Sequence, residues 1–174
     1  MSQSLSSFAD LIRSVEHSAV HLEMRDAYAI SNEDEGFAAW KQGHRLDPGD
    51  RASWWRPWLD LVQEITGKGV VIRRARIVGE PPSEYIRYEH SFTFTNIAAG
   101  EDIRWLPRRQ ASELTLPGND FWLFDSRVVQ FNVFDGEGHW VHTDQTDEPA
   151  VARMCSTAFN AVWEQAIPHD KYAI

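Results

Sequence analysis

The stretch Val70-Val-Ile-Arg-Arg-Ala-Arg-Ile-Val78 is β-branched at both ends, which is typical of a strand. In its second half, Arg74 and Arg76 alternate with the apolar residues Ala75 and Ile77. Successive side chains of a strand point to opposite faces of a sheet, so the two guanidinium groups are predicted to share one face. The stretch therefore predicts a strand with a charged side.

Helices are predicted before and after this strand. Apolar residues spaced by three and four predict them at residues 7–15, 31–43, 57–69, 83–99 and 149–167. Ser31 is expected to cap the second of these helices, and Pro57 fits the first turn of the third. Within the fourth, Phe92-Thr-Phe-Thr95 favours a strand locally and so competes with the helix.

Further strands are predicted from alternating or β-prone runs at residues 20–25, 100–107, 121–124, 128–134 and 139–142. Asp135-Gly-Glu-Gly138 predicts a hairpin between the last two. No internal repeat or linker divides the 174 residues. The sequence therefore predicts a single α+β domain over residues 1–174, with a C-terminal helix. Its sheet is expected to be mainly antiparallel, with a mixed sheet as the alternative, and its helices to pack mostly on one face.

The charge of the chain is acidic, with a formal net charge of −9. Direct binding to nucleic acid by bulk charge is therefore disfavoured. The first seven residues lack the pattern of a signal peptide, and no apolar run is long enough to span a membrane. The single cysteine, Cys155, excludes an internal disulfide, so the expected location is the cytoplasm.

Arginine is concentrated in the middle of the chain. Residues 73–109 contain seven arginines against five acidic residues, a local charge of +2 within the acidic chain. Arginine offers a planar fork of donors that matches phosphate and carboxylate groups, so this segment could bind a small anion. Two other interpretations of the arginine-rich segment stay open. The arginines could form structural bridges to carboxylates, and GC-rich codon usage could explain the preference for Arg over Lys.

Acidic and phenolic residues accompany the arginines. Glu23, Arg25 and Tyr28 begin on the predicted strand at residues 20–25 and end in the following loop. Tyr85 and Glu89 share a face of the predicted helix at residues 83–99, with Tyr88 beside them, and Arg87 turns away. If the two groups meet, a carboxylate, a phenol and a guanidinium would line one pocket and could bind a polar ligand or move a proton.

No cofactor or metal is predicted. His17 and His21 lack the spacing of the zinc protease motif, and His139 and His142 fall on opposite sides of a strand. Neither a glycine-rich phosphate loop nor a serine nucleophile elbow is present. Cys155 lies on an apolar helical stripe and is read as a core residue.

Four runs resemble a family of uncharacterised actinobacterial proteins, known as a domain of unknown function and often encoded beside helix-turn-helix regulators. The runs are His21–Tyr28, Arg74–Pro81 with Tyr85–Glu89, Gly100–Arg108 and Asp120–Asp125. The resemblance covers nearly the whole chain but implies no activity. Together with the charge pattern, it marks these candidate ligand-binding residues: Glu23, Arg25, Tyr28, Arg74, Arg76, Tyr85, Arg87, Glu89, Arg104, Arg108, Asp120 and Asp125.

The leading functional hypothesis is an accessory or regulatory protein that binds a small anionic ligand or a regulator partner through this face. An alternative is a small transferase or hydrolase acting on a nucleotide-like or acyl substrate, with Glu23 or Glu89 as acid or base. A third reading, a pure protein-binding partner of a helix-turn-helix regulator, predicts a large exposed apolar patch.

Overall fold

A computed structural model describes residues 7–29 and 34–174 of the chain. Its helices are α1 (Phe8–Arg13), α2 (Asp34–Lys41), α3 (Arg51–Trp54), α4 (Pro57–Thr66), α5 (Glu84–Ala98) and α6 (Pro149–Gln165), with short 3-10 turns at Arg108–Ala111 and His169–Lys171. Five of the helices lie close to the predicted positions, and the short helix α3 was not predicted. The predicted cap at Ser31 lies outside the described residues. Residues Phe92–Thr95 are helical within α5, so their local preference for a strand is overridden.

The strands are β1 (Ser18–Glu23), β2 (Val71–Val78), β3 (Glu101–Pro107), β4 (Asp120–Phe124), β5 (Val128–Phe134), β6 (Trp140–Thr146) and β7 (Ile167–Pro168). The hairpin predicted at Asp135–Gly138 joins β5 to β6. The two-residue strand β7 was not predicted. It follows α6 directly and pairs with β3, where Pro168 lies opposite Arg104.

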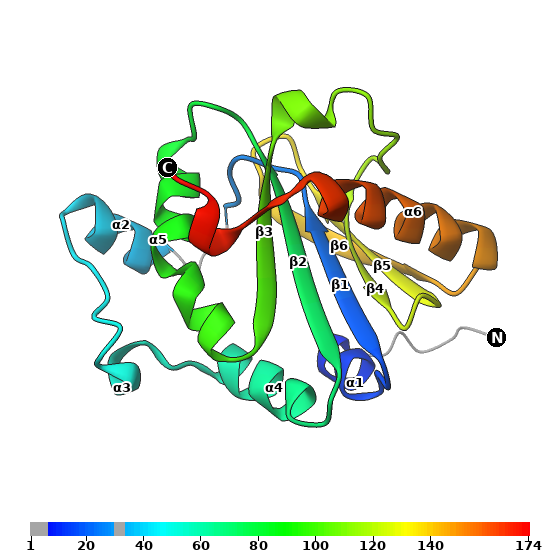
Figure 1. The fold of residues 1–174 in the computed structure, drawn as a ribbon, viewed down its shortest axis with the longest axis horizontal. Coiled ribbons are helices and arrows are strands. Elements are labelled where there is room, and N and C mark those ends of the chain that lie inside the picture. The colour runs from blue at the N-terminus through cyan, green and yellow to red at the C-terminus, as the bar shows by residue number, and fades with distance from the viewer. Residues whose placement is uncertain (1–6, 30–33) are drawn as a thin grey trace.

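The strands form one mixed sheet in the order β6-β5-β4-β1-β2-β3-β7 (Figure 1). Strands β1, β2 and β3 are parallel, whereas all other pairings are antiparallel. The α+β class and the C-terminal helix are therefore confirmed. The centre of the sheet is parallel because α2–α4 and α5 provide the crossover connections that parallel neighbours need.

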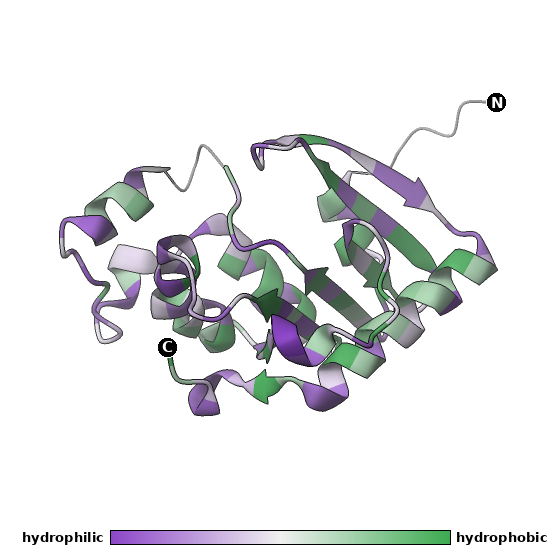
Figure 2. Ribbon diagram, turned by 90° about the horizontal axis from the view of Figure 1, so that it is seen from above, coloured by the Kyte–Doolittle hydropathy of each residue, from purple (hydrophilic) through white to green (hydrophobic). Residues whose placement is uncertain are grey.

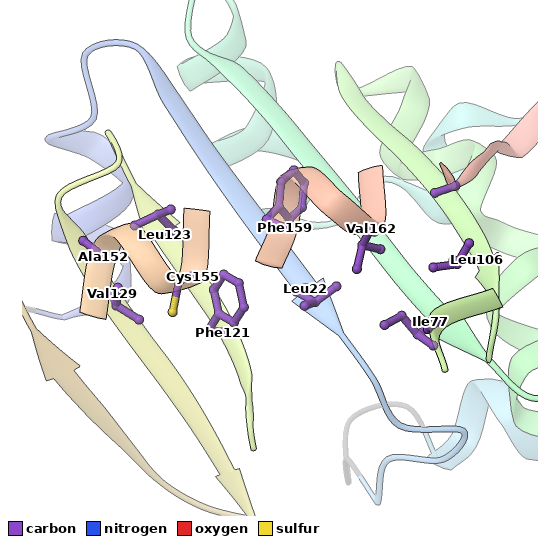
Figure 3. Packing of buried hydrophobic residues seen from close by; sticks show 13 residues of the cluster. Leu22, Ile77, Leu106, Phe121, Leu123, Val129, Ala152, Cys155, Phe159 and Val162 are labelled. Atoms are coloured by element: carbon purple, nitrogen blue, oxygen red, sulfur yellow. The ribbon is translucent and has the colours of Figure 1, made fainter. Parts of the chain in front are cut away.

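One face of the sheet is covered by α6. Figure 3 shows Cys155, Phe159 and Val162 of this helix packed over Leu22 and Phe121. All five side chains are at most 1% exposed. This face therefore supplies a continuous apolar core. Along the strands, hydrophobic residues alternate with hydrophilic ones (Figure 2), and many of the hydrophilic ones point to the opposite face.

The opposite face carries the other helices, as expected for helices gathered mostly on one side. Helices α1 and α4 pack around Ile12, Leu59 and Ile72 near one end. Helix α5 packs against β3 around Ile86 and Trp105. Ser83 is the N-cap of α5, and its hydroxyl accepts a hydrogen bond from the Ile86 amide at 3.1 Å. These helices enclose the charged side chains of β1 and β2.

None of the helices within residues 7–29 and 34–174 combines the length and the apolar character that a membrane crossing requires.

Candidate functional site

The charged face of β2 holds a buried network of ion pairs. The Arg74 Nε donates a hydrogen bond to Glu101 Oε1 at 2.6 Å, and its Nη1 donates to Glu23 Oε1 at 3.2 Å. Glu101 is the first residue of β3, and Glu23 is the last residue of β1. Arg74 therefore links two strands on either side of its own strand. The Arg74 side chain is 10% exposed and that of Glu101 is fully buried.

Arg76 continues the network toward α5. Its Nη2 donates a short hydrogen bond to Glu89, and its Nε lies 3.0 Å from Glu23 Oε2 in an ion pair. Glu23 is thus held between two arginines. Burial alone would raise the pKa of the Glu23 carboxyl, but the charges of Arg76 and Arg74 lower it to about 2.

A cavity of about 230 Å³ lies beside this network, between the sheet and α5. Six of the twelve candidate residues line it, so the two predicted polar groups do meet. They are Glu23, Tyr28, Arg74, Arg76, Tyr85 and Glu89. Buried Glu89 Oε1 has no hydrogen-bond partner among the described residues. Each guanidinium carries five N–H donors, and the carboxylate hydrogen bonds described above use two of those of Arg74.

A third arginine in the cavity wall, Arg56, was missed by the sequence analysis. It immediately precedes Pro57 at the start of α4, and its guanidinium donates to Thr95 Oγ1 at 3.2 Å and Asn96 Oδ1 at 3.0 Å. Asn96 in turn donates to Glu101 Oε2 at 2.8 Å, which connects Arg56 to the sheet network. Arg56 is separate in sequence from the arginine-rich segment, so charge density could not reveal it.

A larger cavity of about 570 Å³ adjoins the first, because Glu23 and Tyr28 line both. Its wall includes Asp120, Phe134 and Trp140. The Tyr28 hydroxyl donates a short hydrogen bond to Asp120, whose other oxygen accepts from the Met24 amide at 2.9 Å. Burial raises the pKa of the Asp120 carboxyl to about 6, against the opposing effect of the Tyr28 hydrogen bond.

His21 separates the larger cavity from the apolar packing around Trp122. Its ring stacks on that indole with centroids 4.2 Å apart. Burial lowers the pKa of the imidazole to about 3, and the nearby charges of Arg74 and Arg76 act in the same direction, whereas Glu23 opposes them. The His21 ring is therefore neutral at neutral pH and does not provide an acid or a cation.

The remaining candidates do not line the smaller cavity. Two of them are Arg25 and Arg87. Arg25 donates to the Asp135 carbonyl at 3.3 Å and lies over the Phe134 ring, so it holds the β5–β6 hairpin. Arg87 is half-buried on α5. Its charge is close enough to Tyr172 to lower the pKa of that phenol against the larger effect of burial, which raises it.

Arg104, Arg108 and Asp125 make structural contacts and do not line the smaller cavity. Arg104 lies on the α6 face with its guanidinium 4.2 Å from the centroid of the Trp163 ring. Arg108 pairs with Asp26 at 3.0 Å. The Asp125 carboxylate accepts hydrogen bonds from the amides of residues 16, 17 and 18 at 2.8–2.9 Å, which fixes the entrance to β1.

The two candidate carboxylates are poorly suited to acid–base catalysis. A catalytic base needs a pKa near the working pH, and the Glu23 pKa of about 2 leaves its carboxylate a very weak base. Glu89 is fixed by Arg76, and its side chain is 4% exposed. At Glu23 and Glu89, the arrangement is better suited to holding a polar group than to transferring a proton.

Solved structures with a similar fold share little sequence with this chain. A phospholipase D family member, Nuc from Salmonella typhimurium, is 9% identical over 92% of this chain and 86% of its own, with a TM-score of 0.51. NucT from Helicobacter pylori is 10% identical over 93% and 88%, with a TM-score of 0.55. The archaeal chromatin protein TrmBL2, whose structure shows DNA binding, is 14% identical over 91% of this chain and 47% of its own, with a TM-score of 0.48.

The likenesses to Nuc and NucT concern the fold alone, because the same fold can carry unrelated sites. No curated protein matches the sequence. The model of the DUF6879 family, a domain of unknown function, matches residues 6–174, so the chain belongs to this family. Membership confirms the domain of unknown function that the four sequence runs resemble.

Proposed function

We propose that this member of the DUF6879 family is an accessory or regulatory protein that binds the anionic group of a small molecule in the cavity between its sheet and α5. We further propose that it acts in the cytoplasm and that, as the sequence resemblance implies, its source is an actinobacterium. The observation that carries the proposal is the lining of the cavity. Among the described residues, it has three arginines, Arg56, Arg74 and Arg76, and two glutamates, Glu23 and Glu89.

The three guanidinium groups come from two separate elements, so they surround the space from more than one side. Arg74 and Arg76 rise from β2, and Arg56 enters from the start of α4. Planar guanidinium groups bind phosphate and carboxylate through paired hydrogen bonds, and a partly buried site strengthens such bonds. Two carboxylates in the same wall keep Arg74 and Arg76 oriented when no anion is bound.

The likeness to Nuc, a phospholipase D family member, adds no activity to this proposal. At 9% identity the likeness concerns the backbone, whereas a reaction depends on side chains at the site. Direct binding to nucleic acid is not proposed either, since the chain carries a net charge of −9.

Inorganic phosphate provides the first test, with the melting temperature followed at constant ionic strength. We expect phosphate to raise the melting temperature and Arg56→Gln to weaken its apparent affinity about tenfold, the value of one charge-assisted hydrogen bond. Arg109→Gln is the matched control, because the Arg109 side chain is 78% exposed and is not part of the cavity wall. A phosphate response that is absent, or equal in Arg56→Gln, would reject the proposal.

A regulator partner is a second candidate, because the edge of the sheet exposes apolar residues. Strand β6 is the outermost strand and pairs with β5. Trp140 and Val141 at its start are 56% and 52% exposed. Open strand edges can accept a partner strand, and exposed aromatic residues often anchor interfaces.

The partner hypothesis is tested by co-expression with a helix-turn-helix regulator encoded beside this chain. Co-purification should be lost in the double variant Trp140→Ser with Val141→Ser and kept in Arg56→Gln. If the regulator fails to co-purify with the unmodified chain, or if the edge variant still retains it, β6 is not the docking surface.

A further inference from the structure

An apolar groove continues from the arginine-lined cavity on the α2 side of α5. The groove has a volume of about 430 Å³ and runs between α2 and α5. Arg56 and Phe92 line both the groove and the cavity, so the two spaces share a wall. The Arg56 guanidinium lies 5.5 Å from the centroid of the Phe92 ring. Any ligand group held by Arg56 is therefore next to the opening of the groove.

Aromatic side chains of both helices line the groove. Trp40 of α2 meets Tyr88 of α5 edge to face with ring centroids 6.1 Å apart, and the ring centroids of Tyr88 and Phe92 are 4.7 Å apart. Because these rings contact one another, the open space lies beside them, next to the small side chain of Ala39. An aromatic wall of this kind suits a flat ring, because offset and edge-to-face ring contacts both become available.

The position of the Tyr88 ring against α2 depends on Gly36. A Cβ atom at this position would lie 2.5 Å from the Tyr88 hydroxyl oxygen, closer than real Cβ contacts allow. The hydroxyl can therefore lie against α2 because residue 36 has no side chain. Gly36 and Tyr88 both line the groove, so this contact helps to hold Tyr88 in its wall.

We infer that the ligand is a planar aromatic molecule carrying one phosphate or carboxylate group, with its anionic group at Arg56 and its ring in the groove between α2 and α5. This inference rests on the proposed function, since the cavity receives the anionic group. It adds the class of molecule to which that group belongs. The ring would bury apolar surface that inorganic phosphate lacks, so it should add affinity.

The experiment compares the affinities of phenyl phosphate, benzoate and inorganic phosphate for the full chain by titration calorimetry. We expect phenyl phosphate to bind about tenfold or more tightly than inorganic phosphate, since ring burial of this size is worth at least one factor of ten. The benzoate titration shows whether a carboxylate can replace the phosphate. Arg56→Gln should weaken the binding of both aromatic anions.

Filling the groove tests where the ring binds. Ala39→Phe should lower the ratio of phenyl phosphate to inorganic phosphate affinity toward one, because the new side chain takes the place of the ring. Ser91→Phe fills the same groove from α5 and serves if the first variant does not fold. Ala38→Phe is the matched control: it makes the same change at the neighbouring, exposed position of α2, which is outside the groove wall.

The outcomes separate the two proposals. Phosphate binding that depends on Arg56 but gains nothing from a phenyl group would overturn the aromatic ligand class and leave the anion site standing. A phenyl gain that survives both groove-filling variants would also overturn it, because the ring would then bind elsewhere. If neither phosphate nor either aromatic anion binds, the proposed function itself fails.

Discussion

Arg73 and Arg74 are neighbours in β2, yet they lie on opposite faces of the sheet and have different surroundings. Arg73 is half-buried on the α6 face, with its guanidinium 5.5 Å from the centroid of the Trp163 ring. Arg74 is buried on the α5 face between Glu101 and Glu23. On one face, arginines border an apolar core. On the α5 face, they are buried within the core itself. The same residue type therefore contributes differently to stability on the two faces.

The two faces also differ in the free energy of burying their side chains. On the α6 face, burial of Phe159 and its neighbours removes apolar surface from water, which is favourable without any partner group. On the α5 face, each buried charge loses its hydration and is compensated only through its ion pairs. The second face is therefore sensitive to the loss of a single partner.

The largest effect is expected from Arg76→Met. This change leaves Glu89 buried without its ion-pair partner and removes one of the two arginines beside Glu23, so it should lower the free energy of unfolding by about 3–5 kcal/mol. Chemical denaturation measures the loss. Arg73→Met, the same change on the other face, should cost less than about 1 kcal/mol. Similar losses in the two variants would show that the faces do not differ as described.

A smaller effect, which depends on pH, is expected from His21→Phe. The His21 pKa is about 3 in the folded protein and 6.5 in the unfolded chain, so below pH 6.5 the unfolded chain binds a proton that the folded protein excludes. Stability therefore falls as the pH falls. Phenylalanine removes this titration and can keep the stacking on Trp122, so the variant should gain about 2–3 kcal/mol relative to wild type between about pH 6.5 and pH 4.5.

Denaturation curves at the two pH values test this prediction. Leu22→Ala, on the same strand but on the apolar face, is the control, because its cost should be the same at both pH values. The assignment of the pH effect to His21 would be wrong if the stability of His21→Phe relative to wild type did not change with pH.

The smallest effect is expected from Arg104→Gln. The substitution removes a cation–π contact with Trp163, which is worth about 0.5–1 kcal/mol at a partly exposed site. Arg104 lies on the α6 face, so the response to phosphate should stay at the wild-type level. A weakened phosphate response would place Arg104 in the ligand site and contradict the division between the faces.

Much of the fold could be predicted from local pattern. The alternation in Val71–Val78 separates a charged face from an apolar one, and the apolar spacing in α4 and α6 reflects burial on one side. Both patterns are properties of each element alone. The parallel pairing of β1, β2 and β3 could not be predicted in this way. Strand β7 could not be predicted either, because two residues are too few to show a periodic pattern.

The candidate site could be predicted only in part, because some of its residues are brought together by contacts between distant parts of the chain. Arg74, Arg76 and Glu89 were identified because they lie within the arginine-rich segment or on a recognisable face of an element. Arg56 was missed because its position depends on how α4 docks against α5, a contact between distant parts of the chain. Asp125 was included because it is polar and part of the resemblance, although its carboxylate fixes a turn.

The sequence by itself determined which residues alternate, where charges concentrate and that the chain forms an α+β fold. Only the tertiary structure decided which charges neutralise one another. A strand pattern places Arg74 and Arg76 on the same face but does not say what covers that face. Ion pairs and cavities depend on distances of a few ångströms between separate elements, and those distances are set by packing of the whole chain.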